Sequence, residues 1–470
     1  MKTLALPCGA MVPLCLVQRV SASAVVYPVG SLHKTVPRRS ACCKVVSTKA
    51  AAFDDVFGFS AKEEGSGIEN AGGANAARAK RSNWRQGGLV ITLILSSVVF
   101  IAFIFVDSLL WRAVRRSSAT FLLTAPFVCS LVATGCLGSY CVPLLAKLKA
   151  QQIFRVEGPA SHLSKAGTPT MGGLFFIPVG VGVARAATRF SSTEVAGVAA
   201  ATLVFAAIGL LDDFLSLAKK HNYGVPGPFK FLLEVVSGVC FFFWLDSAGL
   251  PSPYKVYVNV SSSLADIFSF LFFGYRKNLV PLPPPVGLWN IGKWYLPLTA
   301  FCFAAMANGV NLTDGLDGLA GGTAALAFAG MAVAVLPIYP ALGVFGASMA
   351  GACVGFLLHN RHKASVFMGD TGSLALGAAL AAMASCTGLF LPLFIASGVF
   401  VIETVSVMAQ VAYFRYTKRV HGTGRRLLRM APFHHHLEHL GMEELHIVAG
   451  AYLVSALLVT FAAHVGLISA

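Results

Sequence analysis

The segment from Asn308 to Ala320 contains the residues best suited to chemistry. It reads NGVNLTDGLDGLA and places two amides and two carboxylates at intervals of three residues. Charged groups at membrane depth are costly and usually face a cavity, a partner or a metal, so this polar stretch between two apolar runs predicts a functional site. The four side chains would share one helical face unless the intervening glycines break the helix, and a polar contact between packed helices is the alternative. They are Asn308, Asn311, Asp314 and Asp317.

Two other places in the chain add carboxylates. Asp212 and Asp213 end an apolar run in GLLDDF, and Asp370 lies in a glycine-flanked turn, FMGDTG, shortly after Asn360. Adjacent helical residues point about 100° apart, so one of the paired aspartates can face a metal while the other faces a substrate. A pair of solvated acids is the alternative, although a helix C-terminus disfavours negative charge. An Asp-Thr-Gly turn alone proves little, but three carboxylates on one face would supply the hard oxygen ligands that Mg²⁺ prefers.

Two loops supply groups suited to an anion. Lys165 begins KAGTPTMGG, which enters a helix where free backbone N–H groups suit an anion, although such residues also serve simply to start a helix. Residues 432–438 read PFHHHLE and follow Arg425, Arg426 and Arg429. Consecutive side chains diverge and no HxxxH spacing occurs, so the histidines do not indicate zinc. Imidazoles beside arginines suit a phosphate or an anionic headgroup, and a basic loop held by anionic lipids is the alternative.

The composition places these residues in a membrane protein. The chain has 470 residues, of which 56% are hydrophobic and 12% charged, and its mean hydropathy is +0.72. Soluble domains average about 25% charged residues, so lipid is the expected solvent. The net charge of +16 falls in short clusters between apolar runs, which favours loop charges that orient membrane spans and argues against nucleic-acid binding. The eleven cysteines show no metal-ligand or disulfide pattern.

Apolar runs of about 17 to 25 residues, long enough to cross a bilayer as helices, must position the polar groups. We therefore expect an all-α polytopic membrane protein with about ten core transmembrane helices and one possible extra N-terminal helix. The run at 373–386 is the shortest. The runs lie near residues 89–110, 120–146, 171–188, 195–214, 229–249, 294–310, 317–337, 341–359, 373–386, 389–412 and 447–469.

If every run crosses once, all the polar motifs emerge on one side of the membrane. That side also holds most of the lysines and arginines of the loops, so the positive-inside rule puts it in the cytoplasm-equivalent compartment. Arg112, Arg115 and Arg116 fall on the other side. Either the segment 89–110 lies in the interface or the rule is locally overridden.

The N-terminal region has a different composition. Residues 1–52 contain no acidic residue and are rich in Ser, Ala, Val, Lys and Arg, which is typical of an organelle transit peptide. A secretory signal with its apolar core at residues 4–17 is the alternative. We expect a linker at 53–87, an extra apolar or interfacial segment at 88–118, and a transmembrane domain at 119–470. An insertion at 251–293 interrupts that domain, and its sequence indicates no role.

Three aspartate clusters, a lysine loop and a His/Arg loop on one membrane face describe a Mg²⁺-dependent phosphoryl-transfer site whose acceptor arrives from the bilayer. Five motifs in order, KAGTPTMGG, GLLDDF, NGVNLTDGLDGLA, VFMGDTGSLALG and MAPFHHHLE, closely resemble the phospho-N-acetylmuramoyl-pentapeptide transferase family of the polyprenyl-phosphate N-acetylhexosamine-1-phosphate transferase superfamily. The resemblance covers roughly residues 120–469. It implies a ten-helix enzyme, commonly a homodimer, that transfers phospho-MurNAc-pentapeptide from UDP-MurNAc-pentapeptide to a polyprenyl phosphate. UMP and lipid I, a precursor in peptidoglycan biosynthesis, would be the products.

The resemblance also implies roles for the motif residues. Asp370 and Asp212 would hold Mg²⁺, and Asp213 would lie close to the metal and to the attacking lipid phosphate. Phe367 would stack on uracil. The residues that would serve catalysis at the sugar-peptide and phosphate region are His434, His435 and His436. The other expected substrate-binding residues are Lys165, Thr170, Asn308, Asn311, Asp314, Asp317 and Asn360.

The chain departs from the family pattern at several points. The family commonly has a lysine three residues after the aspartate pair, where this chain has Ser216, so Lys219 or Lys220 would substitute or the role is absent. The leader is foreign to bacterial members and indicates a plastid (chloroplast) membrane protein with its active site facing the stroma. A UDP-GlcNAc-1-phosphate transferase is the nearest alternative, and the MAPFHHHLE loop disfavours it. A transporter is disfavoured because no pair of similar halves is visible.

Overall fold

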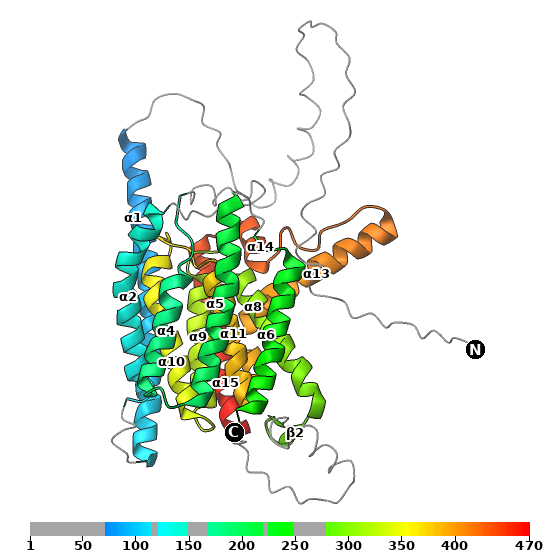
Figure 1. Ribbon diagram of the computed structural model, residues 1–470. Helices are drawn as coiled ribbons and strands as arrows, with labels where there is room; N and C mark the ends of the chain where they lie inside the picture. Colours follow the sequence, from blue (N-terminus) through cyan, green and yellow to red (C-terminus); the bar gives the residue numbers. More distant parts are fainter. Residues whose placement is uncertain (1–70, 115–120, 149–166, 220–223, 249–278) are drawn as a thin grey trace, which may run out of the picture. The chain divides into compact units, whose positions relative to one another are not determined.

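The computed structural model describes residues 71–114, 121–148, 167–219, 224–248 and 279–470 (Figure 1). Residues from Asn83 onward belong to one compact unit, and residues 71–82 belong to another. The predicted transit peptide at 1–52 and Lys165 lie outside the described residues.

The described residues form mainly helices. Each predicted apolar run overlaps a helix, and eight of the described helices are long and apolar enough to cross a membrane, while α4 and α9 are shorter apolar helices. The prediction of an all-α polytopic membrane protein is therefore confirmed. The helices are α1 (Ala71–Val114), α2 (Thr124–Lys147), α4 (Gly173–Ala187), α5 (Thr193–Lys219), α6 (Gly227–Ser247), α8 (Tyr295–Thr313), α9 (Leu319–Val335), α10 (Pro340–Asn360), α11 (Gly369–Thr387), α12 (Phe390–Ala396), α13 (Gly398–His421), α14 (Phe433–His439) and α15 (Glu444–Ser469).

Helices α9, α10 and α11 form the buried core. In the most apolar part of α10, 89% of the residues are buried, against 22% in α1 and α2. Helices that are apolar on every side belong inside a bundle, and small residues let such helices approach closely. Helix α9, LAGGTAALAFAGMAVAV, has this composition. The exposed apolar faces of the outer helices α1 and α2 are left for lipid.

Helix α1 begins earlier than expected. The predicted linker at 53–87 is wrong for residues 71–87, because the alanine-rich stretch AGGANAARAKR is part of α1. Its span, Gln86–Leu110, is long enough to cross a membrane. Buried Asp107 accepts hydrogen bonds from the backbone N–H groups of Leu123 and Thr124 and from the Thr124 hydroxyl, so it caps the start of α2. The rings of Phe103 and Phe127 also pack together, 5.4 Å apart.

The predicted run at 389–412 is two helices. Ser397 separates α12 from α13, and α13 continues to His421, where Gly422 adopts the left-handed conformation common at helix C-termini. In Figure 1 the later part of α13, in orange, extends away from the other helices.

The described part of the 251–293 insertion is a β-hairpin. Strand β1 (Leu279–Pro281) pairs antiparallel with β2 (Leu288–Asn290), and the short 3₁₀ helix Gly292–Trp294 leads into α8. In Figure 1, β2 lies at the opposite end of the helices from α14. The hairpin is therefore remote from the histidine loop.

Candidate active site

The acidic residues meet where α5, α8 and α11 pack together. Helix α11 packs against α5 and α8, and α6 packs against α8. Two glycines bring the backbones into contact at the start of α11. A Cβ added to Gly209 of α5 would lie 2.1 Å from the Asp370 carbonyl oxygen, and one added to Gly173 of α4 would lie 2.3 Å from the Gly372 nitrogen. Only glycine permits such an approach.

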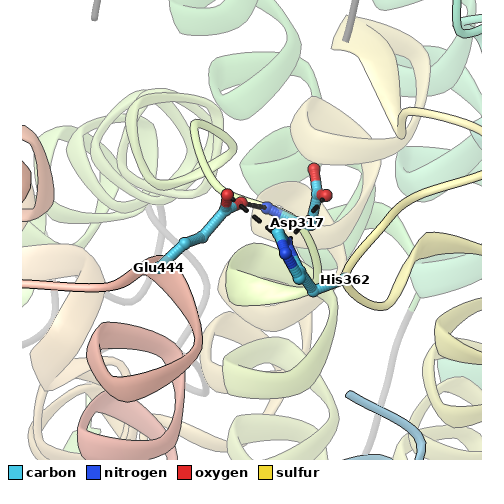
Figure 2. Close-up of side chains that lie close together, drawn as sticks. All are labelled: Asp317, His362 and Glu444. Carbon is cyan, nitrogen blue, oxygen red and sulfur yellow. Dashed lines mark hydrogen bonds and ion pairs between the residues drawn. The ribbon is translucent and has the colours of Figure 1, made fainter. Parts of the chain in front are cut away.

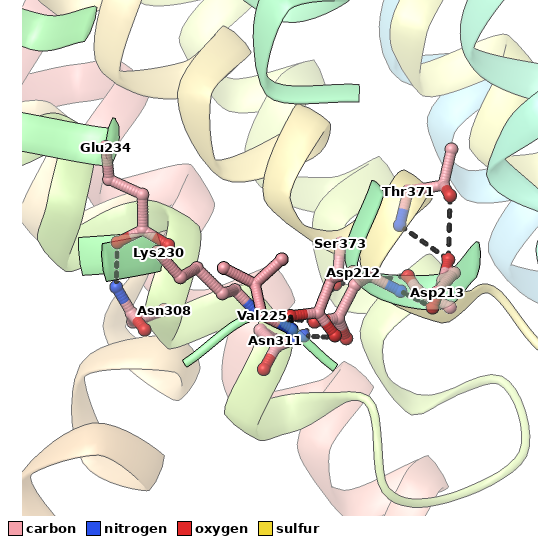
Figure 3. A network of polar contacts seen from close by, with 11 residues as sticks. Asp212, Asp213, Val225, Lys230, Glu234, Asn308, Asn311, Thr371 and Ser373 are labelled. Atoms are coloured by element: carbon pink, nitrogen blue, oxygen red, sulfur yellow. Dashed lines mark hydrogen bonds and ion pairs between the residues drawn. The ribbon is translucent and has the colours of Figure 1, made fainter. Parts of the chain in front are cut away.

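Asp213 caps the first turn of α11 (Figure 3). Its Oδ1 accepts the Asp370 N–H at 3.1 Å, while its Oδ2 accepts the Thr371 N–H at 3.0 Å and the Thr371 hydroxyl at 2.7 Å. An aspartate at a helix N-terminus is stabilised by the free N–H groups and by the helix dipole. Asp213 therefore ties the end of α5 to the residue that follows the FMG turn.

Asp370 is held from two further helices. The Lys230 ammonium of α6 donates to its Oδ2, and the Asn311 amide of α8 donates to its Oδ1 at 2.6 Å. Lys230 also lies 3.8 Å from the Asp212 carboxylate. The Lys230 side chain is 5% exposed, whereas those of Asp212 and Asp370 are 15% and 24% exposed. We call Asp212, Asp213, Asp370 and Lys230 the acidic centre. It carries three carboxylates and one ammonium group, and it is still accessible to solvent.

The chain of polar contacts continues along α6. One turn beyond Lys230, fully buried Glu234 accepts a hydrogen bond from the Asn308 side chain, which also donates to the Ala304 carbonyl at 2.8 Å. Sequence analysis missed Lys230 and Glu234. Two charges four residues apart inside the predicted membrane run 229–249 should have indicated a polar face aimed at other intramembrane charges. Of the cations expected near Ser216, the Lys219 side chain and Lys220 lie outside the described residues.

The second half of the NGVNLTDGLDGLA motif is a turn. Helix α8 ends at Thr313 and α9 begins at Leu319, so only Asn308 and Asn311 share a helical face. Gly318 adopts a left-handed conformation, with φ of 82°. Its N–H donates to the Asn360 side chain at 3.1 Å, and its carbonyl accepts from the buried Tyr452 hydroxyl at 2.7 Å. The turn 314–318 is thereby fixed between α10 and α15.

The two aspartates of this turn have different surroundings. Burial and the nearby carboxylates of Asp370, Asp213 and Asp317 raise the pKa of Asp314 to about 7. Asp317 is buried, and its Oδ2 accepts the Ala364 N–H at 3.0 Å. Asn360, also buried, donates to the Val366 carbonyl at 2.9 Å. Asp314 is thus the member of the turn electrostatically coupled to the acidic centre.

The loop before α4 is joined to the loop before α11 by backbone hydrogen bonds. Phe367 N–H donates to the Pro169 carbonyl at 2.8 Å, and Gly172 N–H donates to the Phe367 carbonyl at 2.8 Å. Thr170 is buried beside Gly369, where an added Cβ would lie 3.0 Å from its hydroxyl. The TPTMGG and VFMGD motifs therefore form one structural unit, with Phe367 half-buried in it.

The three histidines have different polar partners, although the rings of His434 and His435 lie edge to face with centroids 4.2 Å apart, so these two side chains do not diverge as expected. His434 is buried, and its Nδ1 lies 3.2 Å from the carboxylate of buried Glu403 on α13. It also touches the turn 314–318, since a Cβ added to Gly315 would lie 2.3 Å from its Nε2. His435 instead pairs with Glu438 at 2.7 Å.

The third histidine faces the basic loop. His436 accepts a hydrogen bond from the Arg429 N–H at 3.2 Å, and the Arg429 guanidinium donates to the His439 carbonyl at 2.6 Å. Sequence analysis missed Glu403, although a single carboxylate inside the predicted run 389–412 was a signal of the same kind as Lys230. Of the three histidines, His434 is the one that the structure brings to the turn.

Comparisons with known proteins agree with this geometry. Residues 195–388 match the model of glycosyl transferase family 4, and residues 165–177 match a phospho-N-acetylmuramoyl-pentapeptide-transferase signature. A protein of that name from Nostoc sp. is 45% identical over 348 residues, which cover 74% of this chain and 88% of the relative. Others from Nostoc punctiforme and Thermosynechococcus vestitus are 42% identical over 371 residues (79% and 94% covered) and 43% identical over 340 residues (72% and 83% covered).

Proposed function

The chain belongs to the phospho-N-acetylmuramoyl-pentapeptide-transferase family and is therefore a membrane-bound transferase, and we propose the details of its reaction from the acidic centre. The substrate is UDP-MurNAc-pentapeptide and the acceptor a polyprenyl phosphate; the products are lipid I and UMP. The observation that carries the proposal is the convergence of Asp212, Asp370 and Lys230 where membrane helices end. A charged lipid phosphate and a soluble nucleotide can both reach such a position.

The acidic centre suits Mg²⁺. Both oxygens of Asp213 accept hydrogen bonds from the start of α11. Asp212 and Asp370 are also hydrogen-bonded, but they are 15% and 24% exposed, and a carboxylate has further lone pairs for an ion, so we assign the ion to these two residues. Mg²⁺ is usually bound through one or two carboxylates together with substrate phosphates and water, and the partial exposure of both side chains fits this. When bound, the ion would neutralise charge on the diphosphate.

The side chains of this centre then have distinct tasks. Asp213 and Asn311 orient Asp370, and Lys230 neutralises part of the negative charge that the phosphates bring. Asp212, with one oxygen accepting the Val225 N–H at 3.1 Å, faces the acceptor phosphate. In-line attack by that phosphate on the sugar-linked phosphorus needs little base catalysis, because a phosphate monoester has its second pKa near 6. Electrostatic stabilisation is then the main contribution of the protein.

The surrounding motifs bind the rest of the substrate. Phe367 stacks on uracil, and the turn 314–318 with Asn360 forms the wall of the nucleotide site. His434 faces the sugar-peptide and phosphate region, supported by its contact with Gly315 and by Glu403 behind it. The flanking residues that complete the substrate site are Lys165, Thr170, Asn308, His435 and His436.

We also infer a plastid location. The acid-free leader and the cyanobacterial relatives together support import into a plastid, with the enzyme in a membrane and its acidic centre facing the stroma. A homodimer is expected by analogy with the family. Import of a fusion of residues 1–80 to a fluorescent protein tests the location, and a secreted or cytoplasmic fusion contradicts it.

Lipid I synthesis by the detergent-purified chain tests the reaction. With labelled UDP-MurNAc-pentapeptide and polyprenyl phosphate, Mg²⁺-dependent formation of lipid I and UMP is expected. Asp370→Asn should lower turnover at least about 10³-fold, because it removes charge where the diphosphate is neutralised. Asp246→Asn, at the exposed end of α6, is the matched control. Normal turnover by Asp370→Asn, or a GlcNAc-linked product, contradicts the proposal.

A further inference from the structure

A second polar cluster joins the turn 314–318 to two other segments of the chain (Figure 2). It consists of Asp317, His362 and Glu444, and we call it the Asp317 cluster. These residues come from the turn, from the loop between α10 and α11, and from the first residue of α15. None of the three belongs to the acidic centre, and His362 and Glu444 have no part in the reaction proposed above.

The spacing of the cluster matches a metal-coordination polyhedron. His362 Nδ1 lies 3.4 Å from Asp317 Oδ2 and 3.4 Å from Glu444 Oε2. The three ligand atoms all lie within 4.8 Å of one another. Zinc bonds to nitrogen and oxygen of about 2.0–2.1 Å, arranged tetrahedrally, separate ligand atoms by about 3.3–3.4 Å. Nitrogen–oxygen hydrogen bonds are usually shorter, about 2.7–3.2 Å.

The carboxylates are oriented as metal ligands usually are. Glu444 accepts the Asp317 N–H through Oε1 at 2.7 Å, which turns Oε2 toward His362. Asp317 is fixed by the Ala364 N–H. Such outer hydrogen bonds set the direction of a ligand and are typical of metal sites. The side chains are 1% (Asp317), 10% (Glu444) and 12% (His362) exposed, so an ion here would be largely enclosed.

We propose that Asp317, His362 and Glu444 bind a divalent transition-metal ion of the zinc type. One imidazole and two carboxylates are ligands that zinc takes in proteins, whereas Mg²⁺ favours an all-oxygen octahedron. Two carboxylates and a neutral imidazole balance the charge of a divalent cation. The ion would join the turn 314–318, the loop 361–368 and the start of α15.

Such an ion would act on structure. The turn that it anchors contacts His434 through Gly315 and Asn360 through Gly318. Its influence on turnover rests on the proposed function, because that function makes the turn a wall of the nucleotide site. Binding of the ion does not rest on it. Metal content is measured without substrate, so failure of the metal site and failure of the transferase reaction are distinguishable.

Metal analysis of the full-length protein tests the site. Detergent-purified protein is stripped with a chelator, loaded with Zn²⁺ or Co²⁺, desalted and analysed by mass spectrometry of the metal. The wild type should retain one equivalent more than His362→Ala and Glu444→Gln, and bound Co²⁺ should give the intense visible bands of a tetrahedral site. Removal of a ligand should weaken binding by more than the 10- to 100-fold typical of outer-shell changes.

Two controls separate this site from other histidines and carboxylates. His446→Ala removes a 71% exposed imidazole two residues beyond Glu444 and should leave the extra equivalent in place. Asp370→Asn should also leave it in place. Glu444→Gln keeps the size of the side chain, and thermal unfolding identifies a variant that fails to fold. If the wild type binds no more Zn²⁺ than His362→Ala, or if either control loses the equivalent, the proposal is overturned and the cluster is an ion pair.

Discussion

The acidic centre and the Asp317 cluster differ in net charge and in access. The acidic centre sets three carboxylates against one ammonium and keeps Asp370 24% exposed. The Asp317 cluster sets two carboxylates against one imidazole, and its central aspartate is 1% exposed. A larger excess of negative charge with access suits a substrate that binds and leaves, whereas a smaller excess in an enclosed cluster suits a fixed contact. Substitutions in the first region should therefore affect turnover, and those in the second should affect stability.

Lys230→Met should give the largest effect after Asp370→Asn. It removes the buried cation next to Asp370, so transition-state charge on the phosphates loses a partner and turnover should fall about 10²- to 10³-fold. Initial rates of lipid I formation, corrected for folded protein by size-exclusion chromatography, measure it. Lys147→Met, at the exposed end of α2, should behave as wild type. If the Lys230→Met enzyme kept more than a third of normal turnover, the proposed difference between the acidic centre and the Asp317 cluster would be contradicted.

Glu403→Gln should have an intermediate effect on turnover. The substitution keeps the size of the side chain but removes the charge 3.2 Å from His434 Nδ1, so His434 is less well oriented at the turn. We expect a loss of about tenfold in kcat, within the range for a weakened acid–base or charged hydrogen-bond partner. Glu438→Gln, which changes the partner of His435, should cost less. Equal losses of kcat in both variants would show that the orientation of His434 matters no more to turnover than that of His435.

His362→Ala should reverse the pattern and lower stability more than turnover. It removes the imidazole between the carboxylates of Asp317 and Glu444, at an expected cost of about 1–3 kcal/mol. Thermal unfolding in detergent, followed by tryptophan fluorescence, measures the change, and His446→Ala is the exposed control. If the variant kept the Tm of the wild type but lost turnover, His362 would have a catalytic role and not a structural one.

Asp314→Asn should give the smallest effect, visible as a pH dependence. The pKa of Asp314 is raised from 3.8 to about 7, mainly by burial, so between pH 4 and 7 the folded protein binds more protons at this residue than the unfolded chain. Its contribution to stability therefore falls as the pH rises through that range. The variant cannot titrate, so its free energy of unfolding, measured in chelator, should fall less between pH 4.5 and 7.5, with a difference of about 1–2 kcal/mol at the upper end. If the wild type and the Asp314→Asn variant showed parallel pH profiles, Asp314 would not be electrostatically coupled to the acidic centre.

Much of the fold followed from hydropathy, because a helix that crosses a membrane must be long and apolar. Every predicted run overlaps a helix, and the family resemblance is confirmed by relatives that are 41–45% identical. The break at Ser397 was not predicted, since the run 389–412 shows no change of composition there. Residues 71–87 were assigned to a linker on composition alone. Local propensity and packing decided those details.

The candidate site was predictable only as a list of separate motifs. Asp370 and Lys230 are 140 residues apart in the chain, and their contact depends on how α6 and α11 pack, which one sequence does not reveal. The sequence-based prediction placed the site residues at the ends of the apolar runs. It therefore did not include Lys230, Glu234 or Glu403, which lie within the runs. His362 and Glu444 were not predicted because neither belongs to one of the five motifs. Charges inside a predicted membrane helix deserved the same weight as the motifs.

The contacts of Gly173 and Gly209 with the start of α11 set a limit for protein engineering. Any side chain at either position would push against the backbone at residues 370–372 and displace Asp370. Single substitutions at Gly173 or Gly209 would therefore disturb the acidic centre. Substitutions meant to alter substrate specificity should instead be made at exposed positions. The basic loop before α14 offers such positions, because Arg425, Arg426 and Leu427 are exposed. A library restricted to residues 423–430 would keep the centre intact and vary what is delivered to it.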